Sequence, residues 1–285
     1  MAPGHDHPGR GQTHGLITGD NIIVNGGNLT SIHNMYCSPP PSQQVLDILY
    51  PQVGPPRIDG RLLHNSKAYE IFRRSCSNPE SRERMIYELA DACAANNSIL
   101  RRDWYHVFRR HYSRAIALGL AQRLAGQSIL LASIILHTPS QSCTQYIVPT
   151  LAYQLIQNIP SSAEHILAAI RYDPCIFERD TGTQFKQLVE RPLKLASKQA
   201  SLEELAKWPS VIVVDGNANQ FSPGSAPQQV VQLVGNLLAD DSLDIRLSLV
   251  LTSSTTVFDR TMIITLALQQ SAGGTACYFT WRIYG

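Results

Sequence analysis

The feature that most constrains the fold of this chain is a set of three largely apolar runs with amphipathic segments between them. Residues 128–136 read SILLASIIL, residues 211–215 read VIVVD, and residues 245–251 read IRLSLVL. Runs of this length and composition predict strands that are covered on both faces. Strands that alternate with helices indicate an α/β fold, in which a parallel sheet is packed between helices.

Apolar spacing and capping residues predict the helices that accompany these strands. A helix begins near residue 77, where Ser-Asn-Pro-Glu supplies a cap and a first turn, and its apolar residues fall on one face: Ile86, Leu89, Ala90 and Cys93. The same spacing predicts helices over 113–125, 146–157 and 226–239.

The predicted sheet gathers polar residues at one edge. Asp215 ends one apolar run, and residues 252–254 (TSS) directly follow another. Ligands of open parallel sheets bind at the carboxyl ends of the strands. We therefore expect a ligand site that contains Asp215 and Thr252, and the pattern alone leaves its chemistry open.

The two ends of the chain differ from its centre. We expect a mostly disordered leader over residues 1–45, a helical linker over 46–100, a main domain over 101–258 and a divergent tail over 259–285. Within the leader, residues 21–32 read NIIVNGGNLTSI, and the Asn-Gly-Gly-Asn centre predicts a tight β-hairpin. Our hypothesis is that this hairpin is an assembly motif that stacks with other chains, and the alternative is a flexible leader.

Composition excludes several classes of protein. The formal net charge of +2 is too small to argue for binding to nucleic acid or to membranes. The six cysteines show no C-x-x-C spacing, so neither a zinc site nor a redox pair is indicated. The polar N-terminus is not a secretory signal, and no apolar run reaches the roughly 18 residues that a membrane span needs. We expect a cytoplasmic protein that does not bind membranes.

Several ordered motifs carry a resemblance to a known family. Residues 148–155 read VPTLAYQL, residues 173–177 read DPCIF, and residues 184–193 read QFKQLVERPL. Upstream, residues 62–66 read LLHNS and residues 76–82 read CSNPESR. These segments resemble, in order, the IPTLAYQL, DPSIF, QFxKLIxEPL, linker and CHPGTR segments of NACHT-type P-loop NTPases of the fungal STAND class, also called nephrocystin-like N-terminal domains.

The resemblance covers roughly residues 60–258 and implies a P-loop NTPase-like fold. Members of the family are similar to innate-immunity receptors, in which a nucleotide switch lies between an N-terminal effector and C-terminal repeats. No repeat region follows residue 258, so we expect a chain that is truncated relative to a complete receptor.

The resemblance also implies that the phosphate-binding loop has been lost. Where the family reads WLHGPAGxGKSAIA, residues 104–117 read WYHVFRRHYSRAIA, so the flanks match and the loop does not. Ser113 replaces the Lys that contacts the β- and γ-phosphates, and Arg114 replaces the hydroxyl residue that binds Mg²⁺. Bulky side chains replace the glycines whose backbone wraps the phosphates.

Two later motifs are reduced as well. The family's VIDGLDE becomes VDGNAN at residues 214–219, which keeps Asp215 as a candidate metal ligand and loses the two later acids. A turn-forming or capping Asp is the alternative interpretation of Asp215. The family's TSRP becomes TSST at residues 252–255, which keeps Thr252 and loses the Arg that senses the γ-phosphate.

We therefore expect no enzyme activity and no cofactor. The resemblance implies a non-catalytic remnant of a signalling NTPase that acts, if it acts at all, through protein partners, intact NACHT relatives among them. Ser113, Arg114 and Thr252 are its degenerate cofactor-binding positions, and Asp215 is its candidate metal ligand. The alternative is a switch that binds ATP or GTP with Mg²⁺ and hydrolyses it weakly or not at all.

One further cluster has two interpretations. Five arginines lie within fourteen residues, at positions 101, 102, 109, 110 and 114. Arginine forks suit phosphate oxygens, so the cluster is compatible with a phosphate or nucleic-acid patch. A drifted, solvated loop is the simpler interpretation, and we do not expect nucleic acid to bind.

Overall fold

The computed structural model describes most of the chain between residues 39 and 253. The described residues are 21–25, 28–32, 39–51, 55–70, 79–95, 102–108, 113–136, 145–217, 220–221, 223–240, 242–243, 245–253 and 282–284. Only the backbone is described at 21–25, 28–32, 102–108, 253 and 282–284. The chain divides into two compact units, residues 1–39 and residues 40–285.

In the first unit, the backbone forms the predicted hairpin. β1 (Asn21–Asn25) pairs antiparallel with β2 (Asn28–Ile32), and the register pairs Asn25 with Asn28. This register leaves a two-residue connection, the commonest kind in hairpins, and its favoured turns need residues that accept a positive φ. The two glycines of the sequence meet that need. Residues 1–20, 26–27 and 33–38 of the predicted leader lie outside the described residues. The prediction of a disordered leader is wrong for residues 41–45, which belong to the helix α1 (Pro41–Leu49) and bury Val45.

The second unit contains a five-stranded parallel sheet with the order β4-β5-β6-β3-β7. The three apolar runs of the sequence form β4, β5 and β6, which pair side by side and in parallel, as predicted. The strands are β3 (Arg102–Phe108), β4 (Leu130–Ile135), β5 (Val211–Gly216), β6 (Leu247–Ser253) and β7 (Arg282–Tyr284).

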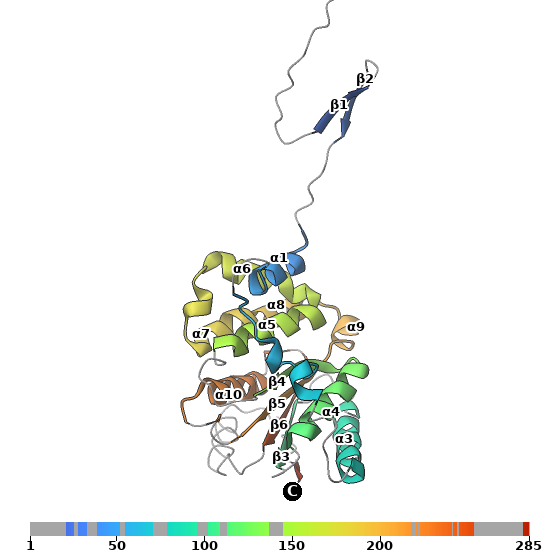
Figure 1. Ribbon diagram of the computed structural model, residues 1–285, viewed down its shortest axis with the longest axis vertical. Helices are drawn as coiled ribbons and strands as arrows, with labels where there is room; N and C mark the ends of the chain where they lie inside the picture. The colour runs from blue at the N-terminus through green and yellow to red at the C-terminus, as the bar shows by residue number, and fades with distance from the viewer. Residues whose placement is uncertain are drawn as a thin grey trace, which may run out of the picture. The chain divides into compact units, whose positions relative to one another are not determined.

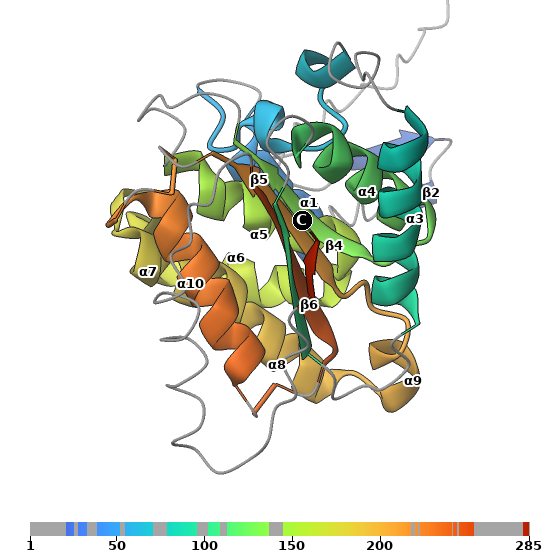
Figure 2. The ribbon, with the colours of Figure 1, turned by 90° about the horizontal axis from the view of Figure 1, so that it is seen from below.

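Helices cover both faces of this sheet (Figure 1 and Figure 2). On one face lie α3 (Pro79–Ala94) and α4 (Ser113–Gly126), and on the other lie α5 (Ile147–Asn158) and α10 (Ala226–Ala239). The residues of β5 alternate between the two sides. Val211 and Val213 pack with the α3 and α4 side, whereas Ile212 and Val214 pack with the α5 and α10 side. The predicted α/β fold, with a sheet between helices, is therefore confirmed.

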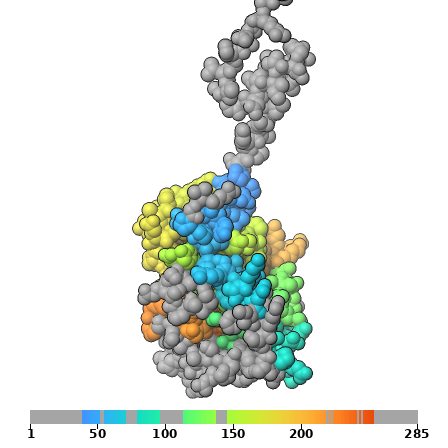
Figure 3. Space-filling view, viewed as in Figure 1, coloured from blue at the N-terminus to red at the C-terminus, as the bar shows by residue number. Residues whose placement is uncertain are grey.

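The remaining helices add to the core of the second unit. They are α1 (Pro41–Leu49), α6 (Ala163–Tyr172), α7 (Thr181–Phe185), a π-helical turn η6 (Lys186–Glu190), α8 (Arg191–Gln199) and α9 (Leu202–Leu205), with 3-10 turns η4 (Pro160–Ser162) and η5 (Ile176–Glu178). α1 packs against α6, and its blue surface borders yellow surface in Figure 3. Among the described helices, none is both long enough and apolar enough to cross a membrane.

α3 and α4 lie where the apolar spacing predicts them. α3 begins at Pro79 and buries every residue of its predicted apolar face: Ile86, Leu89, Ala90 and Cys93. α4 begins at Ser113 and buries Ile116, Leu120 and Leu124, which are spaced four residues apart. The two helices pack against each other, so their apolar faces and one face of the sheet form a single core cluster.

α4 ends in a left-handed cap at Ser128, whose φ is 59°. The N–H of Ile129 donates to the carbonyl of Leu124, and the N–H of Ser128 donates to the carbonyl of Ala125, both at 3.0 Å. These two bonds are those of a Schellman motif, which satisfies the last carbonyls of a helix. The cap turns the chain directly into β4.

Residues 55–70, which lie between α1 and α3 in the sequence, contribute to the core. We predicted a helical linker over 46–100. Its described ends lie in the helices α1 and α3, whereas residues 55–70 form two short 3-10 turns and bury Ile58 and Tyr69. The hydroxyl of Tyr69 donates to the carbonyl of Ile135 in β4 at 3.0 Å. Contacts with the sheet therefore hold this segment in place, and the turns are η1 (Gly60–Leu62) and η2 (Lys67–Tyr69).

Side chains of α5 cover the outer edge of β4, the strand at one end of the sheet. The Oε1 of Gln154 accepts from the N–H of Ser133 at 2.8 Å, and its Nε2 donates to the carbonyl of Ser133 at 2.9 Å. One helical turn later, Asn158 donates to the carbonyl of Leu131 at 2.8 Å. The glutamine of the AYQL motif therefore satisfies backbone groups that would otherwise invite another strand.

Candidate functional site

Three residues that the sequence singles out lie in contact at the carboxyl edge of the sheet. The hydroxyl of Thr252 donates to Oδ1 of Asp215 at 2.6 Å, and Nε of Arg114 donates to Oδ2 at 3.0 Å. A terminal nitrogen of Arg114 also donates to the carbonyl of Leu136. Asp215 is only 1% exposed, so its two oxygens are bound inside the protein.

The topology of the sheet explains why these residues meet. Asp215 in β5 and Thr252 in β6 are register partners, one residue before the end of each strand. β3 leads into α4 on one face of the sheet, whereas β4 and β5 lead into α5 and α10 on the other. Connections that leave to opposite faces mark the point at which open α/β sheets bind ligands. Arg114, in the first turn of α4, lies at this point.

The charge of Arg114 compensates for the burial of Asp215. Burial raises the pKa of Asp215 above its ordinary value of 3.8, and the charge of Arg114 together with the hydrogen bonds from Thr252 and Arg114 oppose that rise. A carboxylate that is taken out of water without a partner costs several kcal/mol. The guanidinium is therefore the group that makes a charged carboxylate tolerable at this position.

The turn that follows Asp215 is closely packed. A Cβ atom on Gly216 would lie 2.5 Å from Cε2 of Phe221, whose ring is 3% exposed and has little room to move. Further on, the N–H of Asn217 donates to Oε1 of Gln220 at 2.7 Å, and the N–H of Gln220 donates to Oδ1 of Asn217 at 3.2 Å. The Asp-Gly pair of the motif is thus explained by packing and by a turn whose polar groups bind one another.

The other predicted positions have mixed outcomes. Ser113 is buried as the first residue of α4, and within the described part of the chain no hydrogen bond joins it to Asp215. Residues 109–112, 218–219 and 254–258, which cover the altered phosphate loop and the lost acids, lie outside the described residues. The expectation of a solvated loop is wrong for Arg114, because its side chain is 21% exposed and pairs with Asp215.

Sequence reasoning missed the ion pair between Arg114 and Asp215. It treated Arg114 as the loss of a hydroxyl and treated Asp215 as a separate candidate ligand. A signal was present, because an Arg in the place of a metal-binding residue, opposite a buried Asp, supplies the same sign of charge as the metal.

The residues at this edge do not fit a Mg²⁺ ion. Mg²⁺ takes oxygen ligands in nearly octahedral geometry. Arg114 replaces an oxygen ligand that the resemblance implies, and its guanidinium lies 3.0 Å from the carboxylate that would hold the metal. Two cations on one buried carboxylate repel each other strongly at such distances.

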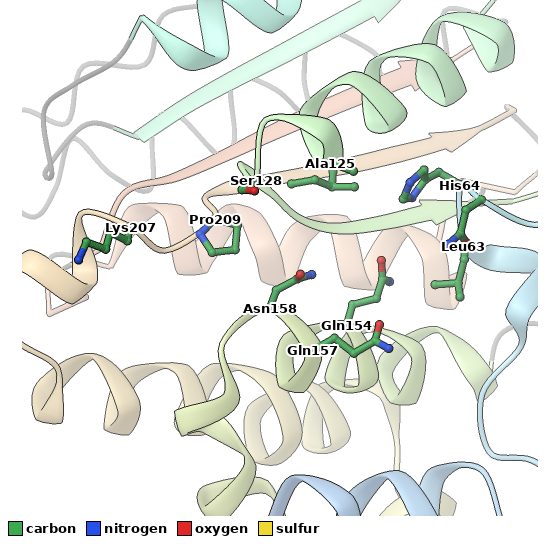
Figure 4. A pocket seen from close by; sticks show the side chains of 11 residues that line it. Leu63, His64, Ala125, Ser128, Gln154, Gln157, Asn158, Lys207 and Pro209 are labelled. Carbon is green, nitrogen blue, oxygen red and sulfur yellow. The ribbon is translucent and has the colours of Figure 1, made fainter.

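A separate cavity of 360 Å³ lies beside the amino ends of β4 and β5. Figure 4 shows Lys207 and Pro209 at one end, His64 at the other, and the amides of Gln154 and Asn158 between them. Sequence reasoning assigned no function to these residues. Polar side chains from four separate segments line this cavity, a property that single motifs do not reveal.

Comparisons with known proteins identify no family for this chain. No family model, no curated protein and no solved structure matches it. The likeness to NACHT domains therefore remains a resemblance of motifs, and the chemistry of the chain's own residues is the basis for a functional proposal.

Proposed function

We propose that this chain is a non-catalytic relative of the NACHT-type P-loop NTPases that acts through contacts with other proteins. The observation that carries the proposal is the ion pair between Arg114 and Asp215. In this proposal, the guanidinium takes the place of Mg²⁺ as the counter-charge of the buried acid. The site is then neutralised without a metal and without a nucleotide.

Phosphoryl transfer requires groups that this arrangement does not supply. The reaction depends on metal ions that bridge the phosphate oxygens, on a Lys that contacts the β- and γ-phosphates, and on a group that positions the nucleophile. Ser113 stands in the position of that Lys, and Ala218 and Asn219 stand in the positions of the two acids. Asp215 accepts hydrogen bonds from Arg114 and Thr252 through both of its oxygens.

The parallel sheet supports the assignment of the fold, although it is shared by other α/β proteins. β3, which precedes α4, is separated from β5 by one strand, and the start of α4 reaches the carboxylate that ends β5. This arrangement is compatible with a P-loop fold, in which the segment between the first strand and the first helix contacts the phosphates. It gives the degenerate positions Arg114, Asp215 and Thr252 a common location.

The alternative is a switch that binds ATP or GTP without efficient hydrolysis. One observation favours it: Arg114 brings a positive charge to the first turn of α4, and helix N-termini favour anions. Under this alternative, a phosphate would compete with Asp215 for the guanidinium. The two proposals therefore differ in whether nucleotide binds to the folded chain.

Thermal unfolding with nucleotides separates the two proposals. The melting temperature of the full chain is measured with ATP, GTP or ADP, each with and without Mg²⁺, and with Mg²⁺ alone. A ligand that binds only the folded state raises its stability by RT ln(1 + [L]/Kd), which is about 2.7 kcal/mol at a hundredfold excess over Kd. We expect no shift from any nucleotide. A saturable shift that Arg114→Met removes would decide for the nucleotide switch.

A further inference from the structure

The cavity beside β4 lies at the opposite end of the sheet from Asp215. β4 begins at Leu130 and β5 begins directly after Pro209 and Ser210, and both Leu130 and Pro209 line the cavity. Its volume of 360 Å³ falls within the range of about 300–1,000 Å³ that is typical of ligand pockets. A ligand here would bind independently of the altered nucleotide edge.

The wall of this cavity is held in place by hydrogen bonds. The N–H and the Nδ1 of His64 both lie within hydrogen-bond distance of Ser133 Oγ, at 3.1 and 3.0 Å. The amide of Gln154 is bound at both ends to the backbone of Ser133. These contacts join the LLHNS segment and the AYQL motif to the same residue of β4. A site whose wall is fixed before binding loses less entropy when a ligand arrives.

Hydrogen-bonding capacity remains on three side chains that line the cavity. Within the described residues, no hydrogen bond or ion pair reaches the ammonium of Lys207 or the amide of Asn65. Asn158 uses one amide hydrogen on the carbonyl of Leu131, which leaves its second hydrogen. An ammonium at one end of the cavity and two amides in its wall offer N–H donors to a ligand that occupies it.

The charge of the lining is positive. Lys207 is the charged residue among the described residues that line the cavity, and Asp and Glu do not occur among them. Hydrogen bonds from Ser201, and less strongly the charge of Lys207, lower the pKa of Glu204, whose carboxylate accepts from the N–H of Ser201 at 2.8 Å. The carboxylate of Glu204 is therefore engaged in the N-terminal cap of α9. The donors that line the cavity favour a ligand that accepts hydrogen bonds and carries negative charge.

We propose that this cavity binds an oxyanion, the carboxylate or phosphate group of a small polar molecule. Lys207 supplies the charge, and the amides of Asn65 and Asn158 supply further donors. Charge-assisted hydrogen bonds of this kind are about twice as strong as neutral ones. A ligand with a carboxylate group and a ligand with a phosphate group would both accept these hydrogen bonds, and the two groups differ in size and charge.

Titration of the full chain with two simple probes tests the proposal. Inorganic phosphate and citrate are each added at constant ionic strength, with sodium chloride as the reference, and binding is followed by calorimetry and by the melting temperature. We expect one of the probes to bind saturably, and the better probe identifies the source of the oxyanion. Saturation by neither probe would overturn the proposal.

Matched variants locate the binding. Lys207→Glu is expected to weaken the binding of the better probe at least tenfold, which corresponds to about 1.4 kcal/mol of binding free energy. Lys198→Glu makes the same change of charge at an exposed position of α8 that does not line the cavity, and it is expected to bind as the wild type does. Asn65→Ala, which keeps the charge, is expected to weaken binding severalfold. The proposal would be overturned if both Lys variants bound the probe equally weakly. It would also be overturned if Lys207→Glu and Asn65→Ala bound the probe as tightly as the wild type does.

Discussion

Replacement of Arg114 by Met is expected to destabilise the fold in a way that depends on pH. Nε of Arg114 lies 3.0 Å from Oδ2 of Asp215, whose side chain is 1% exposed. Met keeps part of the apolar stem but removes the charge and the hydrogen bonds to Asp215 and Leu136. Because one partner of a buried pair is then left alone, we expect a loss of about 3–5 kcal/mol at neutral pH.

The sign of the pH dependence follows from the direction of the pKa shift. Burial raises the pKa of Asp215 in the folded state above its ordinary value of 3.8, and Arg114→Met removes the charge that opposes this rise. The folded variant then holds a proton more strongly than the unfolded chain does. Its free energy of unfolding therefore falls as pH rises from about 4 to the folded pKa. The wild type should show the same trend over a narrower range.

Urea unfolding followed by circular dichroism, between about pH 4 and pH 8, measures this effect. Arg84→Met is the control, because the pair between Arg84 and Glu88 is exposed and its loss should cost at most about 0.5 kcal/mol. Adding Asp215→Asn to Arg114→Met should recover part of the stability at neutral pH. The reasoning would be refuted by an Arg114→Met protein as stable as the wild type at pH 7, or by a loss that is the same at every pH.

Three further predictions concern other parts of the chain. Gln154→Leu should lower the free energy of unfolding in urea by about 2–4 kcal/mol, because it leaves the N–H and the carbonyl of Ser133 in the edge strand β4 without partners. Gln157→Leu, at an exposed position of the same helix, should lower it little. Equal losses in the two variants would contradict the role given to the AYQL motif. Burial alone would raise the pKa of Asp240, but hydrogen bonds from Lys194 and residue 242 outweigh it and lower the pKa from 3.8 to about 2. This carboxylate therefore stabilises the fold above about pH 4, so Asp240→Asn should lose about 1–2 kcal/mol at neutral pH, and a deficit that did not shrink between about pH 4 and pH 2 would argue against the shift. A synthetic peptide of residues 18–36 should form β-rich fibres by electron microscopy if β1 and β2 are an assembly motif, and its failure to do so at any concentration would leave the flexible leader as the explanation.

The strands and the main helices could be predicted because their signals are local. The apolar runs that became β4, β5 and β6 are continuous, as burial on both faces requires. The parallel pairing followed from the alternation of strands with helices. The edge that holds Asp215 and Thr252 followed from the position of each residue at the end of its strand.

The ion pair between Arg114 and Asp215 and the position of residues 55–70 could not be predicted from the sequence, because both depend on the order of the strands in the sheet. Arg114 and Asp215 are 101 positions apart and meet only because α4 starts beside the end of β5. Residues 55–70 lack a periodic pattern, and their position is set by contacts such as that of Tyr69 with β4. Gln154 was recognised as part of a motif, but its role appears only when β4 is known to be an edge strand.

Nucleotide hydrolysis tests the central claim most directly. The full chain is incubated with ATP or GTP and Mg²⁺, and released phosphate is compared between the wild type, Asp215→Ala and a sample without protein. The ion pair of Arg114 with Asp215 and the substitution of Ser113 for the phosphate-binding Lys predict release at the level of the sample without protein. Turnover by the wild type that Asp215→Ala abolishes would contradict the account, because it would show that this carboxylate takes part in catalysis.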